Sequence, residues 1–120
     1  MKEKITVLIA DDNREFSRTL ATYLRNQEDM EVIGIAKDGL EAVNLIKEKL
    51  PDVAILDVIM PHLDGLGVLE KVNNSSSELD KKPICIMLSA VGQDKITQRA
   101  ISLGAEYIQK YFPSNQLRLC

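Results

Sequence analysis

The sequence has two cysteines, no long hydrophobic run and no surplus of basic charge. Cys85 lies inside an apolar run and Cys120 is the last residue, so the pair argues against a disulfide framework and offers no metal-ligand spacing. The longest apolar stretches, "ITVLIA" and "VAILDVIM", are too short to cross a bilayer. The net charge is -3 and the basic residues are scattered, which argues against direct binding to DNA. We expect a cytoplasmic protein with no membrane span and no nucleic-acid partner.

The length of 120 residues and the hydrophobic content of 45% suit one compact domain over residues 1–120. No internal repeat divides the chain. Short apolar runs alternate with longer segments of helical periodicity, which is typical of a parallel sheet covered by helices. The predicted strands are 5–10, 31–36, 53–57, 84–89 and 106–110. The predicted helices are 14–27, 39–49, 65–73 and 94–103, and in the first of them Phe16, Leu20, Tyr23 and Leu24 mark the apolar face.

Acidic residues stand where two of these strands end. Asp11 and Asp12 follow the first strand, and Asp57 ends the third. In a doubly wound sheet of order 2-1-3-4-5 these strands are neighbours, and ligands bind outside their carboxyl ends. Like charges that close require raised pKa values or a cation among them. Oxygen ligands favour Mg²⁺, so we expect a magnesium site at this edge.

Each acid also has a structural explanation. Asp12 or Asn13 would cap the first helix, and Asp64 would cap the third. Capping does not explain an acid at the end of a β-branched strand, as at Asp57. The group of acids therefore favours chemistry over capping.

Two further residues are predicted to lie at the same edge. Ser89 ends the fourth strand, where its hydroxyl could donate to a phosphoryl oxygen, and Lys110 stands near the end of the fifth, where it could balance negative charge. His62, the only histidine, follows Asp57 in a turn, and we assign it little weight.

Together these residues resemble the receiver domain of response regulators, the phosphoaccepting module of two-component signalling. The matching features are the acid pair 11–12, Asp57, the turn "MPHLDG", the pair Ser89-Ala90 and the "LGA" at 103–105. The resemblance implies a flavodoxin-like (CheY-like) α/β fold and a phosphorylation switch without small-molecule turnover.

The resemblance also implies roles for single residues. Asp57 would take a phosphoryl group from a phosphohistidine on a histidine kinase or a histidine phosphotransfer protein. Mg²⁺, or Mn²⁺ or Ca²⁺ in its place, would be held by Asp11, Asp12, Asp57 and the backbone carbonyl of Ile59. Ser89 and an aromatic residue on the fifth strand, here Tyr107, would respond to phosphorylation.

Residues next to the site suggest how long the phosphoryl group lasts. Ile59 and Val91 would border the path of an attacking water molecule, and both are apolar. Neither side chain can orient that water as an amide or an acid could, so we predict slow self-dephosphorylation.

Four segments resemble more narrowly the receivers of sporulation master regulators (stage 0 sporulation protein A) of spore-forming Firmicutes, in their clostridial forms. They are "ADDNREF", "EDMEVIGIAKDGLEAV", "LDVIMPHLDGLGVLEKV" and "LSAVGQDKITQRAISLGA". This resemblance implies transcription control in sporulation through a DNA-binding effector domain, which is not present in this chain.

The C-terminus departs from the family pattern G-A-x-x-Y-x-x-K-P-F. Here "GAEYIQKYFPSNQLRLC" has one residue fewer before the lysine and no proline directly after it. We expect a truncated or absent fifth helix, which would leave apolar surface uncovered. A truncated regulator, an altered terminus and a homodimer in which a second copy covers the gap all explain it, and we favour the first.

Two other functions were weighed. A degenerate receiver that only binds partners fits the changed lysine region. A phosphohydrolase of the haloacid-dehalogenase type fits poorly, because it requires Asp-x-Asp and position 13 is Asn.

Overall fold

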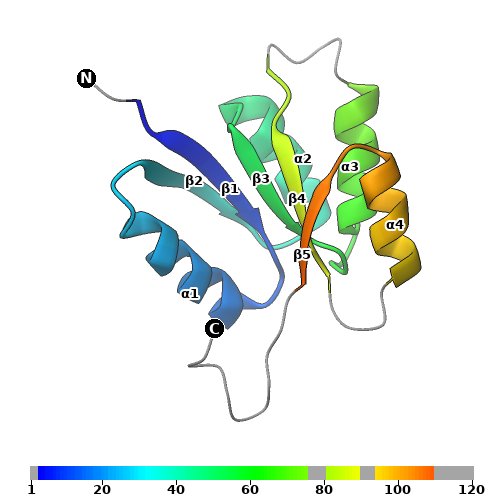
Figure 1. Ribbon diagram of the computed structural model, residues 1–120, viewed down its shortest axis with the longest axis horizontal. Helices are drawn as coiled ribbons and strands as arrows, with labels where there is room; N and C mark the ends of the chain where they lie inside the picture. The colour runs from blue at the N-terminus through cyan, green and yellow to red at the C-terminus, as the bar shows by residue number, and fades with distance from the viewer. Residues whose placement is uncertain (1–2, 76–80, 90–93, 110–120) are drawn as a thin grey trace.

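The computed structural model describes residues 3–75, 81–89 and 94–109. Strands and helices alternate along the chain (Figure 1). They are β1 (Ile5–Ala10), α1 (Arg14–Arg25), β2 (Met30–Ala36), α2 (Gly39–Lys49), β3 (Val53–Asp57), α3 (Gly65–Asn74), β4 (Ile84–Ser89), α4 (Asp94–Ser102) and β5 (Glu106–Gln109). Within these ranges none of the helices has the length and apolar character needed to cross a membrane.

The five strands form one parallel sheet in the order β2-β1-β3-β4-β5, which confirms the predicted fold class. Figure 1 shows all five strands running in the same direction, so their carboxyl ends share one edge. The register pairs Ala10 of β1 with Leu56 of β3, and Asp57 of β3 with Leu88 of β4. The fifth helix and its predicted truncation concern residues outside the described ranges.

The four helices of the described ranges lie on both faces of the sheet, one on one face and three on the other (Figure 1). On one face, Ala21 and Leu24 of α1 pack with Val7 and Ile9. On the other face, α2, α3 and α4 pack over a larger core, whose most buried members include Leu8, Ile46, Leu56, Leu69 and Met87. Because side chains alternate along a strand, β1 and β3 contribute to both cores, as their continuous apolar sequences predict.

The packed face of α1 differs from the predicted one. Leu24 is buried as expected, but Tyr23 has 64% of its surface exposed. The residues that complete the buried face are Ser17 and Ala21, which lie one helical turn apart. The prediction for Tyr23 was wrong because the buried face is centred on Ser17, Ala21 and Leu24, and at 3.6 residues per turn Tyr23 lies to one side of it.

Candidate functional site

The structure brings the three predicted acids together at the carboxyl edge of the sheet. Asp11 and Asp12 directly follow β1, Asp57 ends β3, and these two strands are hydrogen-bonded neighbours. One carboxylate oxygen from each acid lies within 4.8 Å of the other two. The parallel pairing of Ala10 with Leu56 causes this convergence, because it places the next residues, Asp11 and Asp57, at the same level of the sheet.

The three carboxylates differ in how firmly they are held. Asp11 is buried, its Oδ1 accepts a hydrogen bond from the backbone N–H of Asn13 (2.9 Å), and its own N–H donates to the carbonyl of Ala36 (3.0 Å). Asp12 is exposed and Asp57 is half-buried. Asp11 is therefore a fixed point of the group, while the exposed Asp12 can rotate toward a ligand.

The capping alternative is resolved by the residue that caps α1. Asn13 accepts a hydrogen bond from the N–H of Phe16 (3.0 Å) and is the N-cap of the helix. Asp12 therefore does not cap the helix, and it belongs to the group of three acids. Asp64 caps α3, as predicted, and accepts from the N–H of Gly67 (2.7 Å).

The residues fit a hard divalent cation. All three offer carboxylate oxygens, which are the ligands that Mg²⁺ prefers, at bond lengths of about 2.1 Å. Oxygens that bind one Mg²⁺ lie at most about 4.2 Å apart. The oxygens of the three acids lie within 4.8 Å of one another, so a small rotation of the exposed Asp12 side chain would suffice for all three to bind the same ion. Ile59 lies in the loop after Asp57, and the use of its carbonyl stays a prediction.

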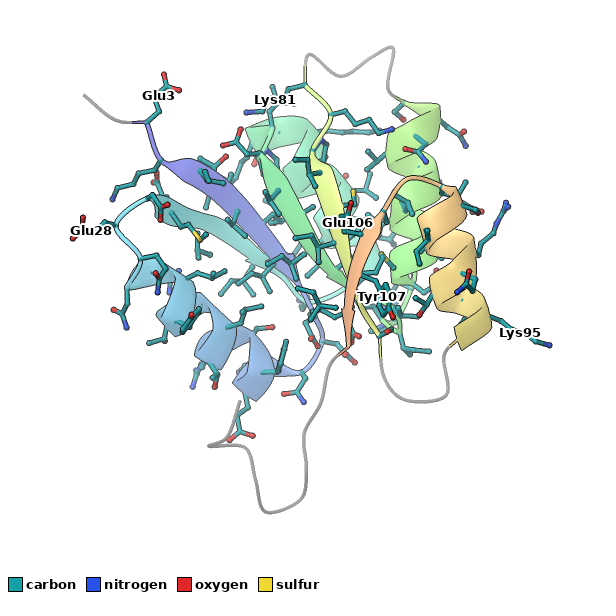
Figure 2. The ribbon with its side chains drawn as sticks, in the orientation of Figure 1. Glu3, Glu28, Lys81, Lys95, Glu106 and Tyr107 are labelled. Carbon is teal, nitrogen blue, oxygen red and sulfur yellow. The ribbon has the colours of Figure 1, made fainter. Side chains whose placement is uncertain are left out.

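Ser89 is buried and ends β4, the strand beside Asp57. Since Asp57 is in register with Leu88, Ser89 stands one position further toward the carboxyl edge. Tyr107 lies on β5 in register with Met87, with 49% of its surface exposed (Figure 2). Lys110 and Val91 fall outside the described residues, so their predicted places are not tested.

A pocket of about 640 Å³ adjoins the acidic group and was not predicted from the sequence. Its lining includes Asp11, Asp12, Arg14, Arg18, Lys37 and His62. Among the described residues the ion pairs are Lys81 with Asp52 and Arg99 with Glu70, so the three basic residues of the lining take part in none. The lining also holds Asp38 and Glu41, so these bases stand among four carboxylates.

The sequence did carry a signal for one wall of this pocket. "KDGLE" at 37–41 places Asp and Glu three residues apart at a helix start, which is a capping arrangement. Asp38 accepts from the N–H of Glu41 (2.8 Å), and Glu41 accepts from the N–H of Lys37 (2.8 Å). These two acids are therefore engaged with backbone groups.

Comparison with known proteins places this fold and site in one family. The response regulator receiver domain family matches residues 7–119. The response regulator domain of CheB from Thermotoga maritima is 35% identical, with 96% of this chain and 84% of that chain covered and a TM-score of 0.83. The signal receiver domain of NarL from Mycobacterium tuberculosis is also 35% identical, with 92% and 87% covered and a TM-score of 0.82.

A more distant likeness shows the fold alone. The receiver domain of Ssk1 from Saccharomyces cerevisiae, crystallised with the histidine phosphotransfer protein Ypd1, is 24% identical, with 98% of this chain and 86% of that chain covered and a TM-score of 0.78.

The match over nearly the whole chain, the 2-1-3-4-5 sheet and the acids at its carboxyl edge agree, and this chain belongs to the response regulator receiver domain family.

Proposed function

We propose that this chain is a phosphorylation-dependent switch whose phosphoacceptor is Asp57. The observation that carries the proposal is the meeting of Asp11, Asp12 and Asp57 within 4.8 Å at the carboxyl edge of the sheet. Receiver domains are phosphoacceptor signalling modules, and membership of that family supports the assignment. Asp57 is the half-buried member of the group, so it is reachable from outside while its backbone is fixed in β3.

Asp11, Asp12, Asp57 and the carbonyl of Ile59 would hold a divalent cation, and we favour Mg²⁺ over Mn²⁺ or Ca²⁺. When bound, the ion supplies positive charge that offsets the oxygens of an incoming phosphoryl group. The protein's part is to keep the carboxylates converged, and the hydrogen bond from Asn13 to Asp11 serves this purpose.

The transfer itself requires no general base, since a carboxylate is already ionised. A carboxylate oxygen of Asp57 attacks phosphorus, the P–N bond of the donor phosphohistidine breaks, and its electron pair returns to the imidazole, which takes a proton from solvent. The product is an acyl phosphate on Asp57. Positioning and charge supply the catalysis, as in other phosphoryl transfers.

After transfer, Ser89 would donate its hydroxyl to a phosphoryl oxygen, and Tyr107 would follow. Ser89 is buried at the end of the neighbouring strand, and Tyr107 is half-exposed, so the ring has room to move. Lys110 would balance charge at the acceptor. The response is a shift between two packings of α4 and β5, which form the described part of the output face.

The donor we propose is a histidine kinase or a histidine phosphotransfer protein. Ssk1, whose receiver shares this fold, was crystallised with such a protein. The basic residues Arg14, Arg18 and Lys37 beside the acids would attract the anionic phosphohistidine as it approaches.

We further propose that the switch serves sporulation in a spore-forming bacterium, acting on transcription in the cytoplasm. The support is the sequence resemblance of four segments to the receivers of sporulation master regulators. In that reading a DNA-binding effector domain outside residues 1–120 carries the output.

Intact mass spectrometry tests the proposal. The protein is incubated with Mg²⁺ and acetyl phosphate, beside Asp57→Asn and beside Asp29→Asn, an exposed acid at the opposite edge of the sheet. We expect a gain of one phosphoryl group, about 80 Da, on the parent and on Asp29→Asn, and no gain on Asp57→Asn.

Two outcomes would contradict the assignment. An equal gain on Asp57→Asn would move the acceptor elsewhere. No gain on a folded parent that binds Mg²⁺ would favour the alternative of a degenerate receiver that acts through partner binding alone.

A further inference from the structure

The loop between β3 and α3, residues 58–64, has a backbone shape that its own sequence does not favour. The N–H of Gly65 donates to the carbonyl of Val58 (2.9 Å) and closes the loop. Inside it, the N–H of Leu63 donates to the carbonyl of Pro61 (2.7 Å), and His62 between them has a φ of 71°. This is a γ-turn with positive φ at a residue that has a side chain, which is a strained arrangement.

The first turn of α2 packs closely against this loop. Gly39 is buried, and a Cβ at its position would overlap the carbonyl group of Leu63 and would stand 2.7 Å from the Cβ of Leu63. These atoms are backbone or attached directly to it, so they cannot turn aside. Contact this close is available only to a residue without a side chain.

Nothing in α2 itself requires glycine at this position. The φ of Gly39 is not in the left-handed region, and alanine is the better helix former. The reason for glycine therefore lies in the loop that it contacts.

The start of α2 is also tied to the other half of the acidic group. The carbonyl of Ala36, at the end of β2, accepts from the N–H of Asp11 (3.0 Å), and the capping bonds of Asp38 and Glu41 fix the next residues. One rigid segment, residues 36–41, thus contacts both Asp11 and the loop that follows Asp57.

We propose that Gly39 is a positioning residue of the phosphoacceptor site. Because Gly39 has no Cβ, α2 packs directly against the loop 58–64. This packing keeps the loop in the shape that brings Asp57 and the carbonyl of Ile59 to the same ion as Asp11 and Asp12. This inference rests on the proposed function and adds to it a part for α2, which contributes no ligand.

Mg²⁺ affinity measured by calorimetry tests the role, with ¹H–¹⁵N spectra recorded at each step. Gly39→Ala is compared with two matched glycine-to-alanine variants. At Gly34 the nearest atom to a new Cβ is the end of the Leu8 side chain, at 3.2 Å, and at Gly67 it is the end of the Leu63 side chain, at 2.5 Å. Both of those neighbours can move.

We expect Gly39→Ala to weaken Mg²⁺ binding about tenfold to 100-fold, the range that applies when residues that orient metal ligands are changed, because the added Cβ displaces the loop that carries Ile59. Its amide signals should shift in residues 58–65 even without Mg²⁺. Gly34→Ala should bind within about twofold of the parent, and Gly67→Ala should lie between the two.

The outcomes separate the two proposals. If the parent itself binds no Mg²⁺, the proposed function fails. If the parent binds and Gly39→Ala binds equally well, or if all three variants weaken alike, the positioning role is overturned. Should Gly39→Ala not fold, Leu63→Gly, which frees the backbone of the loop at the residue that Gly39 approaches, must weaken Mg²⁺ binding in its place, and unchanged binding would overturn the role.

Discussion

Asp52 and Thr6 hold each other by two reciprocal pairs of hydrogen bonds. Oδ2 of Asp52 accepts from the N–H (2.8 Å) and from Oγ1 (3.1 Å) of Thr6, while the N–H of Asp52 donates to Oγ1 (2.9 Å) and to the carbonyl (3.0 Å) of Thr6. Nζ of Lys81 lies 2.6 Å from Oδ1 of Asp52. Figure 2 shows Lys81 beside the start of β4, at the end of the sheet from which the strands begin. The contacts join β1, β3 and the approach to β4.

This network predicts a pH-dependent stability. The hydrogen bond from Lys81, with those from Thr6, lowers the pKa of Asp52 from 3.8 to about 2. A lowered pKa means that the carboxylate stabilises the fold above pH 3.8 and loses this effect as the pH falls toward 2. Urea unfolding should show Asp52→Asn less stable than the parent at pH 7, with the difference shrinking between pH 4 and pH 2.

Lys81→Gln serves as the control, because it removes the first cause and should raise the pKa of Asp52 toward its ordinary value. The interpretation would be wrong if the gap between parent and Asp52→Asn stayed constant over the whole pH range. A wider gap at low pH would also contradict it.

Mg²⁺ is expected to stabilise the folded chain, since an ion that binds only the native state shifts unfolding by mass action. At 100 times the dissociation constant the gain is about 2.7 kcal/mol. Asp12→Asn should lose most of this gain. Its side chain is exposed, so the substitution leaves the packing intact. Thermal unfolding with and without Mg²⁺ measures the effect.

Asp29→Asn makes the same change of charge at an exposed position away from the acids, and it should keep the full gain. Equal stabilisation of parent, Asp12→Asn and Asp29→Asn would mean that Mg²⁺ acts elsewhere on the surface.

The phosphoryl group on Asp57 should be lost slowly. Ile59 follows the acceptor by two residues and has 56% of its surface exposed, so it borders the approach of water without a polar group to orient it. Ile59→Asn should shorten the lifetime of the phosphorylated state by about tenfold or more, because an amide can position the attacking water. Loss of the added mass with time at neutral pH gives the rate.

Ile59→Leu keeps the position apolar and should behave as the parent does. A half-life of seconds for the parent, or equal rates for Ile59→Asn and Ile59→Leu, would rule out this account.

The sequence predicted what depends on periodicity and strand order. Alternating strands and helices predict a parallel sheet, and the family resemblance implies its order, 2-1-3-4-5. Once β1 and β3 are neighbours, the acids after Ala10 and Leu56 lie close together. Contacts of single residues outside the strand pairing were not predictable. The sequence predicts Gly39 only as the start of a helix. Its close approach to Leu63, which the structure shows, explains why this position has a glycine. Tyr23 was misplaced because the large apolar residues of the first helix do not reveal that the small residues Ser17 and Ala21 are on its buried face.

The two ends of the parallel sheet carry separate tasks. Where the strands start, Thr6, Asp52 and Lys81 join β1 and β3 to the approach to β4, and where the strands finish the three acids gather. A substitution at the starting end should therefore change how long the molecule survives heat or acid while leaving its chemistry unaltered. Substitutions at the starting end are thus expected to tune thermal tolerance without disturbing the acids that we propose carry the signal.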